Sequence, residues 1–406
     1  MSEAGTKTKR IQELDIMKGI GIILIAVYHI VFRSMDGIPD KTIRSLGWAF
    51  IGIFFLLSGY TCRVDISVKE CYRRRVMNLL IPVIMLEIVL LVLGGAYCIL
   101  FHDYTTKKVL YDSVVTFLRP EISTRISSGW GEGGILFYNL SPVWFIWSMA
   151  WTELFFHPLR MLTIGKGKGT LSWVILVFVL LVIQVPMYVF LRPAPWGLTI
   201  VPTYLLFMLI GAKLRDRKAF QRLMDVRPLP AVIATVLCLA AHYGLFLFNG
   251  NESYYISKYG NRGALDVFTV LIQVLFATPA IYFISRGIGR LKPLSKGFAW
   301  FGRHTLGVLL MHCIIAVVYC DLLHNYIKPG TCWYPENIGI PLTAEIILKS
   351  ILTCALSLLT CIPLISLWDK FRTWLFGRYK TGEPGLHANG VENEDDQRTE
   401  KRSEGI

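Results

Sequence analysis

Apolar runs of nearly constant length recur along this chain, separated by polar or glycine- and proline-containing breaks. A helix needs about 20 mostly apolar residues to cross the hydrocarbon core of a bilayer. Ten runs approach that length, at residues 15–32, 46–62, 76–101, 143–162, 171–191, 198–214, 230–248, 265–285, 298–320 and 342–367. The sequence therefore predicts an all-α polytopic membrane protein with about ten transmembrane helices.

The composition supports a membrane protein and excludes several other classes. Hydrophobic residues make up 54% of the 406 residues and charged residues only 17%, whereas a soluble domain carries roughly 25% charged residues. Nine cysteines occur without a Cys-x-x-Cys pair, and a thiol inside an apolar run behaves as a small hydrophobe. We therefore expect neither a disulfide framework nor a bound metal.

The basic residues predict how the chain crosses the membrane. A net charge of +14 could indicate a nucleic-acid partner, but the Lys and Arg residues lie in short clusters between the apolar runs. Cationic residues concentrate on the cytoplasmic side of membrane proteins, and most of these clusters fall on one side if both termini are cytoplasmic. We expect a cytoplasmic segment 1–14, a transmembrane domain 15–367 and a cytoplasmic tail 368–406 that is disordered after about residue 381.

Two ionisable residues in the first run lie in register. His29 follows Lys18 by eleven residues, so helical geometry puts both side chains on one face, about 16 Å apart along the axis. That separation resembles the reach of a phosphopantetheine arm, so Lys18 could hold the phosphates of an acyl-CoA whose thioester lies near His29. Alternatively, Lys18 extends to the inner interface and His29 hydrogen-bonds a neighbouring helix.

Three motifs in order carry a resemblance to a known family. The first run reads Leu14-Asp-x-x-Lys18-Gly-(x9)-His29, the second contains Phe54-Phe-x-x-Ser58-Gly-Tyr60, and three arginines precede the third. This order resembles the acyltransferase-3 family of integral membrane O-acyltransferases. The tryptophan-rich stretch 144–153, the stretch 204–211 and the stretch 301–312 are similar to later parts of that family, so the likeness covers about residues 14–367.

The resemblance implies transfer of an acyl group, expected to be acetyl, from cytoplasmic acyl-CoA to a hydroxyl on a glycan or lipid-linked acceptor outside the cytoplasm, as in the modification of cell-envelope polysaccharides. His29 then suits the base that deprotonates the hydroxyl, because a neutral imidazole titrates near physiological pH. The candidate residues for binding acyl-CoA are Lys18, Arg74, Arg75, Ser58 and Tyr60. The arginines could instead be an ordinary topology signal, and Ser-Gly a close contact between helices.

Three more ionisable residues fall within the apolar runs, namely Glu87, Glu153 and His312. Each costs about 2.5 to 3.5 kcal/mol to insert at the centre of a membrane helix, which makes such residues functional candidates. If their helices converge, a carboxylate could orient His29 or His312 as the base, so we take Glu153 and His312 as catalytic candidates. The alternative is hydrogen bonding between buried helices. His157 has no supporting spacing.

A transporter of a small polar solute is the rival hypothesis, because the same charged side chains could line a permeation path. Dependence on acyl-CoA separates the two hypotheses. The expected partners are acyl-CoA, the acceptor and the lipid bilayer, without nucleic acid, and the expected location is the plasma membrane of a bacterium. The acyl chain, the acceptor and a homo-oligomeric state are left open by the sequence.

Overall fold

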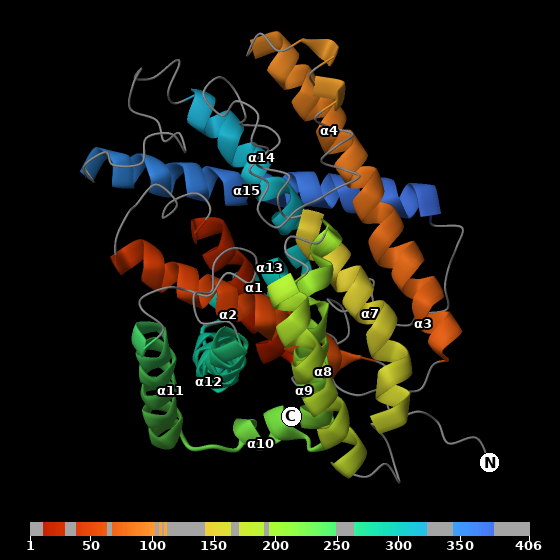
Figure 1. Ribbon diagram of the computed structural model, residues 1–406. Helices are drawn as coiled ribbons and strands as arrows, with labels where there is room; N and C mark the ends of the chain where they lie inside the picture. The colour runs from red at the N-terminus through yellow and green to blue at the C-terminus, as the bar shows by residue number, and fades with distance from the viewer. Residues whose placement is uncertain are drawn as a thin grey trace, which may run out of the picture. The chain divides into compact units, whose positions relative to one another are not determined.

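The computed structural model describes residues 11–28, 38–62, 67–101, 105–107, 109–111, 143–163, 170–190, 195–248, 264–322 and 344–376. Every regular element in these ranges is a helix and none is a strand (Figure 1), as the apolar runs predict. His29, the predicted base, lies outside the described residues.

The helices follow one another with short connections in most of the described chain. In order they are α1 (Gln12–Val27), α2 (Ile38–Thr61), α3 (Val68–Arg75), the π-helical η2 (Val76–Leu80), α4 (Ile81–Phe101), α7 (Val143–Thr163), α8 (Thr170–Phe190), the 3-10 helix η4 (Pro195–Ile200), α9 (Val201–Asp216), α10 (Ala219–Met224), α11 (Pro228–Phe248), α12 (Ala264–Gly289), α13 (Lys292–Arg303), α14 (Thr305–Leu322) and α15 (Ala344–Phe376).

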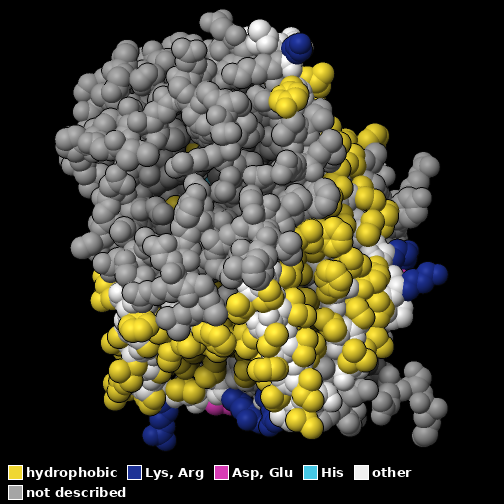
Figure 2. Space-filling view, in the orientation of Figure 1, with side chains coloured by type: hydrophobic (Ala, Val, Ile, Leu, Met, Phe, Trp, Pro, Cys, Tyr) yellow, Lys and Arg dark blue, Asp and Glu magenta, His cyan; other side chains and the backbone are white. Residues whose placement is uncertain are grey.

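Five helical stretches in the described residues are long and apolar enough to cross a membrane, namely Thr170–Met187, Gly197–Asp216, Pro228–Phe248, Phe268–Gly289 and Ile351–Phe371. Each predicted apolar run coincides with a helix for most of its length, while the count of ten crossings stays a prediction. Helix α9 is mostly buried, whereas α8 and α11 expose large apolar side chains such as Phe178 and Leu237. Hydrophobic side chains accordingly cover much of the visible described surface (Figure 2).

Two helix pairs pack closely through glycines. A Cβ atom on Gly59 of α2 would overlap the Met208 carbonyl of α9, and one on Gly211 of α9 would overlap the Leu56 carbonyl of α2. Helices α1 and α13 meet in the same reciprocal way, through Gly19 on α1 and Gly302 on α13. Small residues let the backbones of membrane helices approach each other, so that dispersion contacts hold them together.

The sequence predicts one helix over residues 298–320, but the structure has two helices there. Helix α13 ends at Arg303, the next residue leaves helical geometry with φ −109 and ψ 21, and α14 begins at Thr305. The side chain of Thr305 donates a hydrogen bond to the Gly302 carbonyl at 2.8 Å. The break falls in the polar stretch Arg303-His304-Thr305. Helix α13 buries Ser295, Ala299 and Gly302, and it packs against α1.

Hydrogen bonds join several basic segments at one end of the helices. Arg215, in the last turn of α9, donates to the Cys62 carbonyl beyond α2. Arg286, in the last turn of α12, donates to the Val226 carbonyl at 2.6 Å. These chain segments therefore lie at one end of the helices, and we expect them to share one side of the membrane. That this side is the cytoplasmic one stays a prediction.

The chain divides into two compact units, Met1–Ile362 and Pro363–Ile406. The described part of the second unit is the end of α15, up to Phe376. The Phe371 ring lies 5.6 Å from that of Trp368 and 5.9 Å from that of Trp374, centroid to centroid. This end of α15 thus carries one stripe of aromatic side chains. All residues discussed below belong to the first unit.

Candidate active site

Three ionisable residues line one face of α7, a helix that is otherwise mostly apolar. His157 and Arg160 follow Glu153 by four and seven residues, and at about 100° per residue these steps come within about 40° of full turns. All three residues are buried, with exposed fractions of 3% for Glu153, 1% for His157 and 4% for Arg160. Because burying charge is costly without compensation, this face requires polar partners from other helices.

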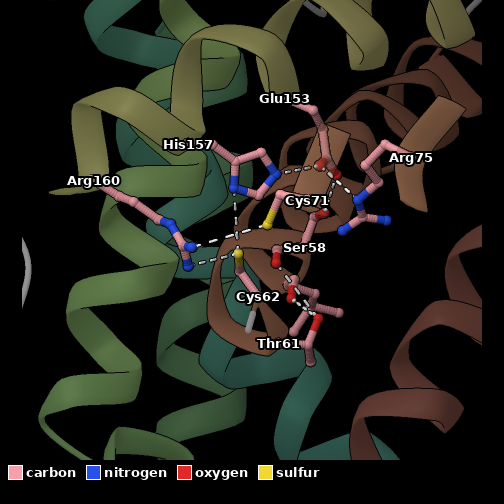
Figure 3. A network of polar contacts seen from close by, with 9 residues as sticks. Ser58, Thr61, Cys62, Cys71, Arg75, Glu153, His157 and Arg160 are labelled. Atoms are coloured by element: carbon pink, nitrogen blue, oxygen red, sulfur yellow. Dashed lines mark hydrogen bonds and ion pairs between the residues drawn. The ribbon is translucent and has the colours of Figure 1, made fainter. Parts of the chain in front are cut away.

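Glu153 is the centre of the resulting cluster (Figure 3). Its Oε1 atom accepts a hydrogen bond of 3.1 Å from the Ser58 hydroxyl of α2. Its Oε2 atom forms an ion pair of 2.8 Å with Nε of Arg75, the last residue of α3. The same Oε2 lies 3.3 Å from Nε2 of His157. Three helices thus bring a hydroxyl, a guanidinium and an imidazole to one buried carboxylate.

The contact with Glu153 determines how His157 faces its other neighbour. A carboxylate only accepts hydrogen bonds, so Nε2 of His157 carries a proton, and in the neutral imidazole Nδ1 is then the acceptor. The Nδ1 atom lies 4.0 Å from the Cys62 sulfur. The Tyr72 ring packs edge-on against the imidazole, with centroids 5.9 Å apart. The imidazole is therefore held between a carboxylate and a thiol.

Arg160 extends the cluster to two cysteines. Its Nη1 atom donates to the Cys62 sulfur at 3.2 Å, and its Nη2 atom lies 3.9 Å from the Cys71 sulfur. Both cysteines are buried. Burial raises the pKa of the Cys71 thiol in α3, and the positive charge of Arg160 offsets part of that rise. A guanidinium beside a thiol favours the thiolate form.

The three consecutive arginines of α3 divide between two carboxylates. Arg73 and Arg74 both pair with Glu70 one turn earlier, at Nε–Oε distances of 2.8 and 2.7 Å. The hydrogen bonds from these two arginines lower the pKa of Glu70 to about 2. Arg75 points instead to Glu153, because successive side chains on a helix are turned by about 100°. The side chain of Arg75 is 42% exposed, so it reaches from the surface into the cluster.

Of the residues proposed from sequence, the structure brings Ser58, Arg75 and Glu153 together. The sequence also allowed the Ser-Gly pair to be a close contact between helices. Gly59, next to Ser58, makes such a contact between α2 and α9. Arg74 lies one residue before the cluster, paired with Glu70. These positions keep the basic cluster and the buried carboxylate at the same end of α2.

The other proposed residues lie on other elements. The Tyr60 hydroxyl donates to Gln221 of α10 at 2.8 Å, which fastens that short helix to α2. His312 is fully buried in α14 and its Nδ1 donates to the Val308 carbonyl at 2.8 Å. Lys18 lies half-buried in α1, which packs mainly on α13, α12 and α2. Glu87 is in α4, with its side chain outside the described atoms.

His157, Arg160 and the two cysteines were not predicted from the sequence as site residues. A signal for the first two was present, because Glu153, His157 and Arg160 recur at the spacing of one helix face. No comparable signal marks Cys62, which meets its partner His157 across 95 residues of sequence. Among the described residues, no group of three His, Cys, Asp or Glu side chains is arranged to hold a metal ion.

One comparison with known proteins returned a match. A family model described as "Acyltransferase domain", that of the acyltransferase-3 family, matches residues 11–365. No curated protein and no solved structure matches the chain significantly. The matched range includes every residue of the cluster around Glu153.

Proposed function

The chain belongs to the acyltransferase-3 family, and from this premise we propose that it transfers an acetyl or other acyl group from cytoplasmic acyl-CoA to a hydroxyl of a glycan or lipid-linked acceptor outside the cytoplasm. The family and the apolar helices make the chain a multi-pass membrane acyltransferase. The donor, the acyl group, the acceptor and a bacterial plasma membrane as its location belong to the proposal.

The observation that carries the proposal is the ion pair between buried Glu153 and half-exposed Arg75 at the end of the bundle where basic segments meet. Acyl transfer from a CoA thioester needs cations for the phosphates, a proton acceptor for the hydroxyl and donors for the tetrahedral oxyanion. Here exposed arginines lie directly beside a buried carboxylate, a hydroxyl and an imidazole. An acyl-CoA donor would match this arrangement if its phosphates bound the arginines outside the cluster and its thioester lay inside the cluster.

Arg75 is placed to contact both the phosphates of acyl-CoA and the cluster around Glu153. Its Nε atom contacts Glu153, its side chain is 42% exposed, and its two terminal nitrogens are proposed to bind phosphate oxygens. Lys18 and Arg74 are the further candidates for phosphate binding. Ser58 and Tyr60 are proposed to line the path of the donor, although the Tyr60 hydroxyl is already engaged with Gln221.

We retain His29 as the proposed base that deprotonates the acceptor hydroxyl, and His312 as the second histidine candidate. A neutral imidazole accepts a proton at physiological pH. Glu153 stabilises positive charge on a histidine in contact with it, as a carboxylate does in a catalytic triad. In the described structure that contact is made by His157.

The test is donor consumption by the full-length protein in detergent. The purified protein is mixed with acetyl-CoA, released CoA is measured with a thiol reagent against a blank without acetyl-CoA, and acetyl-CoA binding is measured on the same sample. We expect release by the wild type and a fall of roughly 100-fold or more in His29→Ala, with binding kept. Absence of acetyl-CoA binding would overturn the proposal and favour the transporter hypothesis.

A further inference from the structure

The thiol of Cys62 occupies a position with the contacts of a nucleophile. It lies 4.0 Å from Nδ1 of His157 and receives a hydrogen bond of 3.2 Å from Nη1 of Arg160. On its other side, the imidazole contacts Glu153 at 3.3 Å. A nucleophile beside a base, with the base oriented by a third group, is the arrangement that activates side chains for covalent catalysis.

The proton positions match this role. Because Glu153 accepts from Nε2 of His157, the lone pair of Nδ1 faces the Cys62 sulfur and can take its proton. The guanidinium of Arg160 then stabilises the thiolate by charge and by its hydrogen bond. Both interactions act inside a buried region, where electrostatic attractions are stronger than in water.

We propose that Cys62 carries the acyl group as a covalent thioester between the donor and the acceptor. The inference rests on the proposed function, because acyl-CoA must be the donor. In the first step, His157 takes the thiol proton, the Cys62 sulfur bonds to the acyl carbon of acyl-CoA and the bond from that carbon to the CoA sulfur breaks. The CoA thiolate leaves with the proton from His157, so the products are S-acyl-Cys62 and free CoA.

In the second step the acyl group leaves the protein. The acceptor hydroxyl oxygen bonds to the acyl carbon, the bond from that carbon to the Cys62 sulfur breaks, and the hydroxyl proton ends on the sulfur by way of a histidine. The exchange of one thioester for another is nearly balanced in energy, whereas conversion of a thioester to an oxygen ester runs downhill. The first step is therefore reversible, and this reversibility can be measured.

Cys71 serves as a matched control for the proposal. Both thiols are buried and both contact Arg160, but Cys71 lies 3.9 Å from Nη2, and the contact with His157 belongs to Cys62 within the described part of the chain. A role for buried thiols in packing alone would make the two cysteines equivalent. A covalent role singles out Cys62.

The experiment is isotope exchange without acceptor, using the full-length protein in detergent with acetyl-CoA and labelled free CoA. A covalent carrier transfers label into acetyl-CoA, because CoA leaves before the acceptor binds. We expect exchange in the wild type and in Cys71→Ala within about threefold, and a loss of at least about 100-fold in Cys62→Ala.

A second measurement does not depend on how a variant folds. Wild-type protein incubated with acetyl-CoA and digested should give a Cys62 peptide whose added acetyl group is removed by hydroxylamine at neutral pH. Absence of both this adduct and the isotope exchange would overturn the proposal that Cys62 carries the acyl group. Full exchange in Cys62→Ala would overturn it as well.

Failure of the carrier is distinguishable from failure of the proposed function. Wild-type protein that binds acetyl-CoA and releases CoA, but shows neither exchange nor adduct, transfers the acyl group directly, so only the carrier is wrong. Wild-type protein that does not bind acetyl-CoA overturns both proposals. If Cys62→Ala loses acetyl-CoA binding, Cys62→Ser replaces it, because the hydroxyl keeps a hydrogen-bond acceptor for Arg160.

Discussion

At the scale of single residues, Glu153 shows how a membrane helix can hold a carboxylate. An ionised carboxylate in an apolar environment needs a counter-charge and hydrogen bonds to offset the loss of water. Glu153 is 3% exposed and has an arginine, a serine and a histidine within hydrogen-bond distance. Of these three, the guanidinium of Arg75 carries a permanent positive charge.

We expect Arg75→Ala to destabilise the protein by roughly 1–3 kcal/mol. Removing one partner of a buried pair leaves the other charge uncompensated, and the figure is reduced here because Arg75 is 42% exposed and partly screened by water. Adding Glu153→Gln to Arg75→Ala should recover part of the loss, since the charge left behind is removed. The measurement is the thermal unfolding midpoint in detergent.

Arg73→Ala is the control for that comparison, because its partner Glu70 belongs to the exposed ion pairs of α3. The midpoint of this variant should stay close to that of the wild type. A double variant that is less stable than Arg75→Ala alone would show that the charge of Glu153 is compensated by groups other than Arg75.

At the scale of elements, glycines determine how closely the helices that carry the site can pack. Ser58 lies on α2 beside Gly59, and Gly59 meets the Met208 backbone of α9. Gly211 of α9 meets the Leu56 backbone of α2 in return. The position of the Ser58 hydroxyl opposite Glu153 therefore depends on the packing of α2 against a third helix, α9, as well as on α7.

Gly211→Ala should destabilise the protein by about 1–3 kcal/mol, because the new methyl group would overlap a backbone carbonyl that cannot rotate away. The matched change is Gly244→Ala in α11, where a Cβ atom would have no neighbour within 4 Å. Alanine there should be neutral or stabilising by up to about 1 kcal/mol.

Unfolding midpoints of the two variants in the same detergent make the comparison, and CoA release reports the effect on the site. We expect Gly211→Ala to lose both stability and CoA release, and Gly244→Ala to keep both. Equal midpoints for the two glycine variants would show that α2 and α9 are not in close contact.

At the scale of the whole molecule, the contacts among basic segments require a common side of the membrane. Arg215 and Arg286 tie the ends of α9 and α12 to neighbouring chain segments. Helix α11 runs from Pro228 beside these segments to Phe248 at its far end. The two ends of α11 should therefore face opposite compartments.

Single cysteines at Arg217, Lys292 and Phe248 test this arrangement with a maleimide that does not cross membranes, scored as the gain over the parent protein. Arg217→Cys and Lys292→Cys should behave alike, and Phe248→Cys should behave in the opposite way. With the predicted cytoplasmic termini, Phe248→Cys is labelled in intact cells and the other two only after permeabilisation. Labelling of Arg217→Cys and Lys292→Cys from different sides would contradict the shared side.

The sequence by itself determined the class of the protein, the family and the approximate place of most of the long apolar helices, but not the short helices α3 and α10. The length of a membrane span, the grouping of basic residues and the register of side chains along one helix are local properties. For the same reason, Glu153 could be selected as an ionisable residue inside an apolar run. The family follows from motifs in order, and the match over residues 11–365 confirms it.

Only the tertiary structure decided which side chains meet. The polar stretch Arg303-His304-Thr305 lies inside the run 298–320, but only the structure shows that α13 ends there and packs against α1. Arg75 rather than Arg74 reaches Glu153 because of how α3 lies on α7. His157 and Cys62 become neighbours across 95 residues, since contacts between helices depend on how the whole bundle packs and not on spacing along one segment.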